Sequence, residues 1–149
     1  MTIYLILLAL IIICAGGLIA LFTGASYKGA TWIGVISSIL GAACAIYAAC
    51  SAMFCGYNSS IHMAWPIPFG SFHIGFDPLS AFFVVTISIV CAIAAIYGAG
   101  YLKSYSGRKR IGPAWCFYNL LFASMLIVVI ARNGLLFLIA WEIDRKSVV

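Results

Sequence analysis

Long runs of apolar residues alternate with short polar segments along the whole chain. Four of these runs have about the 20 residues that a helix needs to cross roughly 30 Å of hydrocarbon, and a fifth is half as long. The runs that predict membrane-spanning helices are 3–22, 31–54, 79–102, 114–131 and, for the short fifth run, 134–143. The pattern therefore predicts an all-α fold, a polytopic transmembrane helix bundle with four full spans and a truncated fifth.

The composition agrees with a bilayer environment. Of the 149 residues, 66% are hydrophobic and 7% are charged, whereas soluble domains carry about a quarter charged residues. The mean hydropathy is +1.19. The first run has no Lys or Arg before it and is longer than the apolar core of a signal peptide, so we interpret it as a retained helix.

Positive charges gather in the loop after the third span, where four cations lie within residues 103–110. The positive-inside rule makes this loop cytoplasmic. Alternation then places Lys28 inside, and it places the amino terminus and the segment 55–76 outside. Only Arg132 opposes this topology. We therefore expect a multi-pass protein of the cell inner (plasma) membrane, and the net charge of +5 is explained by topology rather than by nucleic-acid binding.

The segment 55–76 is rich in Gly, Pro and aromatic residues, and we expect it to be an outer loop that contains His62 and His73. At its end, Asp77 is suited to cap the third span and Pro78 to occupy its first turn. Small residues recur at helical spacing within two spans, either as close-packing faces or as incidental Ala and Gly. They are Ser37, Gly41 and Ala45 in the second span and Ala94 and Gly98 in the third.

Neither a metal site nor a cofactor site is predicted. The six cysteines form no C-x-x-C pair and no Cys/His cluster, and small apolar packing residues are the simpler interpretation. The two outer histidines are expected to be plain loop residues. No nucleophile and base stand at workable spacing, so an enzyme with its own active site is the weakest hypothesis.

Glu142 is the residue that points to chemistry. Among the three acids, Asp77, Glu142 and Asp144, it is the one that lies within an apolar run, about nine residues from the outer surface and near mid-membrane. Acids at such depth are rare and usually mark ion or proton paths. Burial raises the pKa of such a carboxyl group and a neighbouring cation lowers it, so a cation that moves could make the group bind and release a proton. The alternative is a solvated carboxylate at a frayed helix end.

The end of the chain does not fit the pattern. The ten residues 134–143 give about 15 Å of helix, which would leave Asp144, Arg145 and Lys146 at mid-bilayer. Unpaired charges there cost several kcal/mol. We therefore expect the chain to be cut short and residues 144–149 to be a foreign or frameshifted tail. A genuine short chain would instead end in a half-span near the surface.

Four motifs together resemble the antiporter-like membrane subunits. They are FDPLSAFF at 76–83, a basic loop with Tyr105 and Gly107, FASM at 122–125 and LIAWE at 138–142. The resemblance is closest to component B of hydrogenase-4, the counterpart of the formate hydrogenlyase membrane subunit. The sequence is also similar to the proton-pumping subunits of complex I and to multisubunit sodium/proton antiporters.

The resemblance implies that Glu142 is a proton-carrying carboxylate whose partner is a lysine two spans later, which this sequence does not contain. It implies a fragment of a proton-translocating membrane-arm subunit of a hydrogenase-4-like oxidoreductase complex. The implied partners are other membrane-arm and hydrophilic redox subunits, which would hold the redox centres, and the cargo would be protons or, alternatively, sodium. Competing hypotheses are a complex I or antiporter subunit of the same fold, and a non-transporting membrane scaffold.

Overall fold

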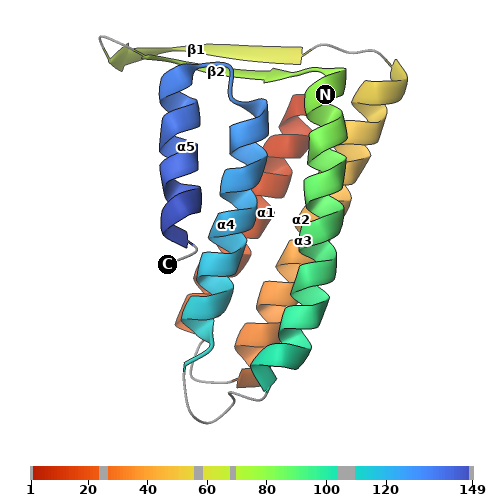
Figure 1. Cartoon of the computed structure of the whole chain (residues 1–149), viewed down its shortest axis with the longest axis vertical. Helices are drawn as coiled ribbons and strands as arrows, with labels where there is room; N and C mark the ends of the chain where they lie inside the picture. The colour runs from red at the N-terminus through yellow and green to blue at the C-terminus, as the bar shows by residue number, and fades with distance from the viewer. Residues whose placement is uncertain (1, 24–26, 56–58, 68–69, 104–109, 148–149) are drawn as a thin grey trace.

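The computed structural model describes residues 2–23, 27–55, 59–67, 70–103 and 110–147. Within them, four long helices stand side by side and a shorter helix lies at one edge (Figure 1). The helices are α1 (Thr2–Phe22), α2 (Tyr27–Cys55), α3 (Pro78–Lys103), α4 (Gly112–Ile130) and α5 (Gly134–Ser147). The four long helices are apolar and long enough to cross a membrane. The predicted polytopic helix bundle is therefore confirmed.

The expected outer loop proves to contain a β-hairpin. Strands β1 (Ser59–Ile67) and β2 (Gly70–Phe76) pair antiparallel, with the backbone of His62 opposite that of His73. The hairpin lies across the upper ends of the helices in Figure 1. Apolar and polar residues alternate along 70–76, which is a strand signal, while Pro66 falls where the register is irregular, as Pro in a strand requires. The strands were not predicted, because Pro and Gly residues are more typical of a loop.

Two helix boundaries differ by four residues from those expected, and the others by at most two. Helix α2 begins at Tyr27, four residues before the predicted span, and α5 continues to Ser147, four residues beyond Ile143. Helix α5 has 14 residues, or about 21 Å at 1.5 Å per residue, which is still shorter than the hydrocarbon layer. The first residues of the tail thus continue the helix, while their foreign origin stays a prediction.

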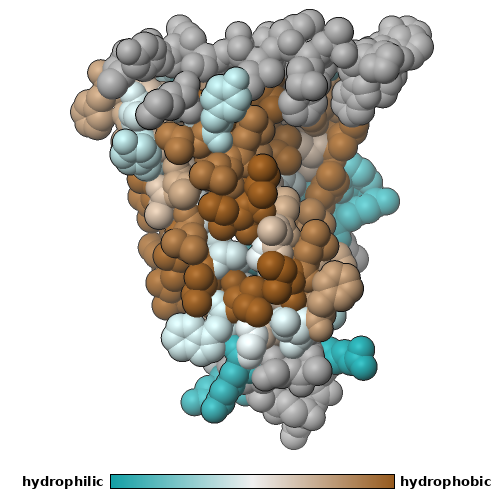
Figure 2. Space-filling view, turned by 180° about the vertical axis from the view of Figure 1, so that it is seen from behind, coloured by the Kyte–Doolittle hydropathy of each residue, from teal (hydrophilic) through white to brown (hydrophobic). Residues whose placement is uncertain are grey.

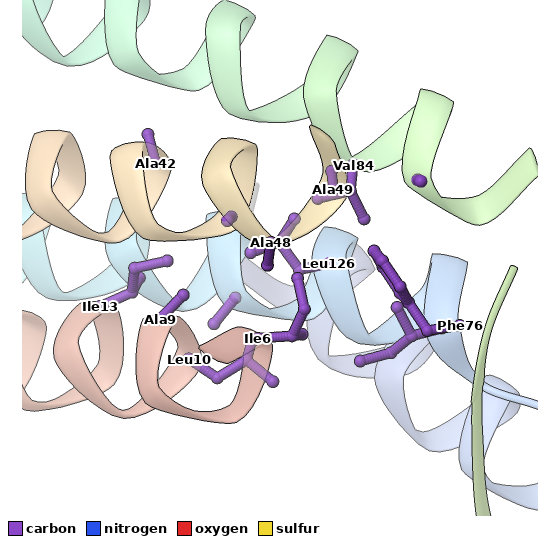
Figure 3. Close-up of a cluster of buried hydrophobic side chains, with 14 of the residues drawn as sticks. Ile6, Ala9, Leu10, Ile13, Ala42, Ala48, Ala49, Phe76, Val84 and Leu126 are labelled. Atoms are coloured by element: carbon purple, nitrogen blue, oxygen red, sulfur yellow. The ribbon is translucent and has the colours of Figure 1, made fainter. Parts of the chain in front are cut away.

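The core lies between α1, α2, α3 and α4 and is closed at the hairpin end by Phe76 of β2 (Figure 3). Ile6 and Ile13 of α1 and Leu126 of α4 are fully buried, and α2 faces them with alanines. In a bilayer, helices associate through close packing rather than through a hydrophobic driving force, and small residues permit that approach. The core is accordingly built from large side chains set against an alanine face.

Glycines of α1 and α2 mark the closest approach of helices. A Cβ atom on Gly41 would lie 2.3 Å from Cγ1 of Ile13, so the predicted small-residue face of α2 is an interface with α1. In α3 the expected face is only partly used, because Ala94 is exposed and a Cβ on Gly98 would meet only the ring of Trp115, at 3.7 Å.

The outer surface is suited to lipid. Large apolar side chains such as Phe22, Phe54 and Tyr97 are exposed, and Figure 2 shows a hydrophobic belt over the middle of one face with hydrophilic side chains at the lower end. Helix order places Lys28 and Lys103 at this lower end, opposite the hairpin. The bundle therefore has one cation-rich end and one end covered by the hairpin.

Candidate functional site

Helix α5 carries Glu142 and begins with a side-chain cap. The Asn133 side chain accepts a hydrogen bond from the Leu135 backbone N–H at 2.8 Å, and the backbone carbonyl of Asn133 accepts one from the Phe137 N–H at 3.0 Å. An asparagine cap satisfies an otherwise unpaired N–H of the first turn. From Gly134 to Glu142 the helix rises about 12 Å, so the acid lies well below the hairpin end.

The carboxylate of Glu142 is held by cations of its own helix. Arg145 donates from Nε to Oε2 at 3.0 Å and from Nη2 to Oε1 at 2.6 Å. The ammonium of Lys146 lies 3.7 Å from Oε1. Two-pronged Arg–carboxylate pairing fixes geometry as well as charge. The i+3 and i+4 spacings of Arg145 and Lys146 are the sequence signal for this contact, since residues three and four apart are neighbours on a helix.

An open apolar groove runs along this side of α5, with a volume of about 580 Å³. Phe117 and Leu120 of α4 form one wall, and Trp141 and Glu142 contribute to the other. The side chain of Glu142 is 43% exposed, and the groove contains few polar groups besides Glu142 and Lys146. The acid thus lies at the edge of an apolar groove, where its ionised form depends on nearby cations.

The side chain of Asp144 lies on the opposite side of α5 from that of Glu142. Residues two apart on a helix are separated by roughly 200°, and Asp144 Oδ1 accepts a hydrogen bond from the hydroxyl of Ser124 in α4 at 3.3 Å. Ser124 is buried. The structure thus brings Asp144 to the interface between α4 and α5, a contact that the sequence did not predict.

A buried polar cluster joins α2 to α4. Asn119 is fully buried, its Oδ1 accepts from the Ser38 hydroxyl at 2.7 Å, and its Nδ2 donates to Ser37 Oγ at 3.5 Å. Gly17 of α1 leaves room for it, since a Cβ there would lie 2.9 Å from Cβ of Asn119. An asparagine within an apolar span was the signal that could have revealed this cluster.

An ion pair links the two helix junctions at the hairpin end. Asp77 caps α3 as predicted, because Oδ1 accepts from the Ser80 N–H at 2.8 Å, and its Oδ2 lies 2.5 Å from Nη2 of Arg132. The Ser80 hydrogen bond and then the Arg132 guanidinium lower the pKa of Asp77 to about 2. Arg132, the cation that opposed the predicted topology, is thus partly neutralised.

We expect the stability contribution of Asp77 to disappear in acid. Its pKa falls from 3.8 to about 2 on folding, so the contribution is complete above pH 3.8 and is lost as pH falls through about 2. Asp77→Asn keeps a cap acceptor but removes the charge. Thermal unfolding in detergent should show a destabilisation by Asp77→Asn that is constant from about pH 5 to 8 and shrinks between about pH 4 and 2. A pH-independent difference would contradict this assignment.

Candidate metal ligands remain dispersed in the part of the chain that the structure describes. There, no group of three His, Cys, Asp or Glu side chains could hold a metal ion. Five cysteines are described as free thiols, and Cys91 is buried. The side chains of His62 and His73 lie outside the described set, so their predicted role as plain outer residues stays a prediction.

Four apolar membrane-crossing helices, capped by a hairpin and flanked by an acid-bearing fifth helix, define a multi-pass helical membrane protein. A family model described as NADH-ubiquinone oxidoreductase (complex I), chain 5 N-terminus, matches residues 65–110. This match covers β2, α3 and the basic loop, the region that carries the first two resemblance motifs.

Two curated relatives extend the comparison. Hydrogenase-4 component B of Escherichia coli is 26% identical over 112 residues, which cover 75% of this chain and 16% of that protein. NADH-quinone oxidoreductase subunit L of Mycobacterium tuberculosis is 36% identical over 94 residues, which cover 58% of this chain and 14% of that protein. The chain therefore spans about one-sixth or less of the length of these relatives. It is related to the antiporter-like membrane subunits, as its sequence motifs predict.

Proposed function

We propose that this chain is part of a proton-translocating membrane-arm subunit of a hydrogenase-4-like oxidoreductase complex, in which Glu142 is the proton-carrying carboxylate. The observation that carries the proposal is the place of Glu142. It is an acid on α5 at the edge of an apolar groove, and the long cationic side chains of Arg145 and Lys146 lie within 3.7 Å of its carboxylate. Similarity to hydrogenase-4 component B over three quarters of the chain supports the choice of complex.

A carboxylate in this setting can exchange a proton when a cation moves. A cation beside the carboxylate, as Arg145 and Lys146 are here, favours the ionised form of Glu142. When a neighbouring cation withdraws, the apolar wall formed by Phe117 and Leu120 favours the neutral form, because few groups in the groove solvate a charge. Alternation between these two states binds a proton and releases it.

The orientation we propose places the amino terminus and the hairpin outside. Lys28, Lys103 and Arg110 belong to the opposite end of the bundle, which the positive-inside rule assigns to the cytoplasm of the inner membrane. Glu142 then lies on a helix that runs from outside to inside.

Redox chemistry in this proposal belongs to hydrophilic partner subunits, and this chain contributes no cofactor. Other membrane-arm subunits would cover its apolar outer surface. A second candidate is a complex I or antiporter subunit of the same fold, with protons or sodium as cargo, and the family match at 65–110 together with the 36% identical relative favours it. A membrane scaffold that carries no ion is the third candidate.

Ion uptake into inverted native membrane vesicles separates these candidates. Formate should drive uncoupler-sensitive acidification of the vesicle lumen, and deletion of the gene for this chain should abolish it. A deletion that affects only NADH-driven uptake would favour the complex I candidate, and sodium uptake enhanced by an uncoupler would favour an antiporter. Unchanged uptake with every donor after deletion would contradict a translocating role.

A further inference from the structure

The chain turns from α4 into α5 against the strand that leads into α3, and three contacts hold it there. The backbone of Ala131 forms a bridge with Ile74 of β2, and Arg132 forms the ion pair with Asp77. One turn into α3, the Ser80 hydroxyl donates to the carbonyl of Val129 at 3.2 Å. These contacts all lie at the hairpin end, before the first residue of α5.

The side chain of Arg132 is confined as well as paired. A Cβ atom on Gly75 would lie 2.5 Å from Nε and 2.6 Å from Cγ of Arg132, so the arginine stem lies directly on the glycine backbone. Its partner Asp77 is itself fixed, because the same carboxylate caps α3. The guanidinium therefore has one defined position relative to the start of α3.

Beyond this turn, helix α5 is held mainly by packing along α4, including the hydrogen bond from the Ser124 hydroxyl to Asp144. Ala140 is the buried residue of its described part, and its contacts are with α4 and β2. Because α5 buries so few side chains, we expect the anchored segment before it to contribute to its depth and rotation. Glu142 lies ten residues beyond Arg132 on this helix.

We infer that Asp77, Gly75 and Arg132 form a clasp that sets the depth and rotation at which α5 presents Glu142. Asp77 and Arg132 are positioning residues, since neither contacts Glu142 or the groove. The inference deepens the proposed function, because it identifies what holds the proposed carboxylate at its depth.

The fluorescence of Trp141 reports this depth directly. Trp141 is the neighbour of Glu142 and is 51% exposed, whereas Trp115 is 1% exposed and shielded from lipid. With Trp32 and Trp65 replaced by Phe, lipids brominated at different depths in proteoliposomes should quench Trp141 according to its position. Trp115 then supplies an unquenched internal reference.

We expect Arg132→Gln to move the depth of maximum quenching by up to one helical turn, about 5 Å. Gly75→Ala should move it in the same way while leaving both charges in place, because the new methyl group displaces the Arg132 stem. Arg132→Lys retains a cation and should restore most of the original profile. Lys28→Gln removes a cation at the opposite end and should change nothing.

An unchanged Trp141 profile in folded Arg132→Gln and Gly75→Ala proteins would overturn the clasp. This readout does not depend on proton transport, so the two proposals fail separately. A shifted profile in the clasp variants, together with full transport in a Glu142→Gln protein, would support the clasp and reject Glu142 as the proton carrier. An unshifted profile, with transport abolished by Glu142→Gln, would reject the clasp and support Glu142 as the proton carrier.

Discussion

Glu142→Gln is expected to reduce proton translocation by about a hundredfold or more, the usual range for loss of a proton-transferring group. Glutamine keeps the size of the side chain, but it cannot load a proton and has one acceptor oxygen where the carboxylate has two. The measurement is the initial rate of lumen acidification in native inverted vesicles, normalised to the amount of assembled protein. Glu142→Asp keeps a carboxyl group and should retain part of the rate.

Arg145→Gln is the matched control for this experiment. It breaks the same two-pronged ion pair but leaves the carboxyl group of Glu142. If Glu142 carries protons, Arg145→Gln should keep translocation within a few-fold of the original rate. Equal losses in both variants would mean that the ion pair, and not the carboxyl group, is what matters.

Gly16→Ala is expected to cause the largest loss of stability among single-carbon changes. A Cβ atom on Gly16 would lie 2.0 Å from Cβ and 2.1 Å from Oγ of Ser37, which forces α1 and α2 apart at their closest approach. Overpacking of this kind typically costs about 1–3 kcal/mol, and the separation of two whole helices places this variant at the upper end. Thermal unfolding in detergent would measure the loss.

Gly100→Ala is the control, because nothing lies within 4 Å of a Cβ there and alanine favours a helix by about 1 kcal/mol. It should be neutral or stabilising. Ser37→Gly added to Gly16→Ala should recover much of the lost stability, because it removes the colliding atoms. Equal stability of Gly16→Ala and Gly100→Ala would contradict the described helix packing.

Much of the fold follows from the sequence because a bilayer restricts what can span it. Without water, backbone groups must pair within a helix, so an apolar run such as 79–102 has few alternatives to a helix. The cap at Asp77 followed from local chemistry and is present. The hairpin did not follow, because its pairing joins residues up to 17 positions apart, Ser59 and Phe76, and short runs interrupted by Pro do not reveal their partners.

The site was predictable in part. Apolar context identified Glu142 as the unusual acid, but it could not reveal which cations lie beside it or that Asp144 turns toward Ser124. The ion pair between Asp77 and Arg132 joins positions 55 residues apart in sequence. They meet because α3 and α4 run in opposite directions, which returns the chain to the hairpin end. Contacts of this range depend on tertiary packing that a pattern of single residues does not contain.

Infrared difference spectroscopy of the protein in native membranes during a pH titration would show directly whether Glu142 takes up and releases a proton. Proton exchange by Glu142 should produce a protonated carboxylic acid C=O band that rises and falls with pH. This band should be absent from the Glu142→Gln spectrum and present in the Asp144→Asn spectrum. A band that survives Glu142→Gln unchanged, or no protonated-acid band at any pH at which the complex works, would contradict this role of Glu142.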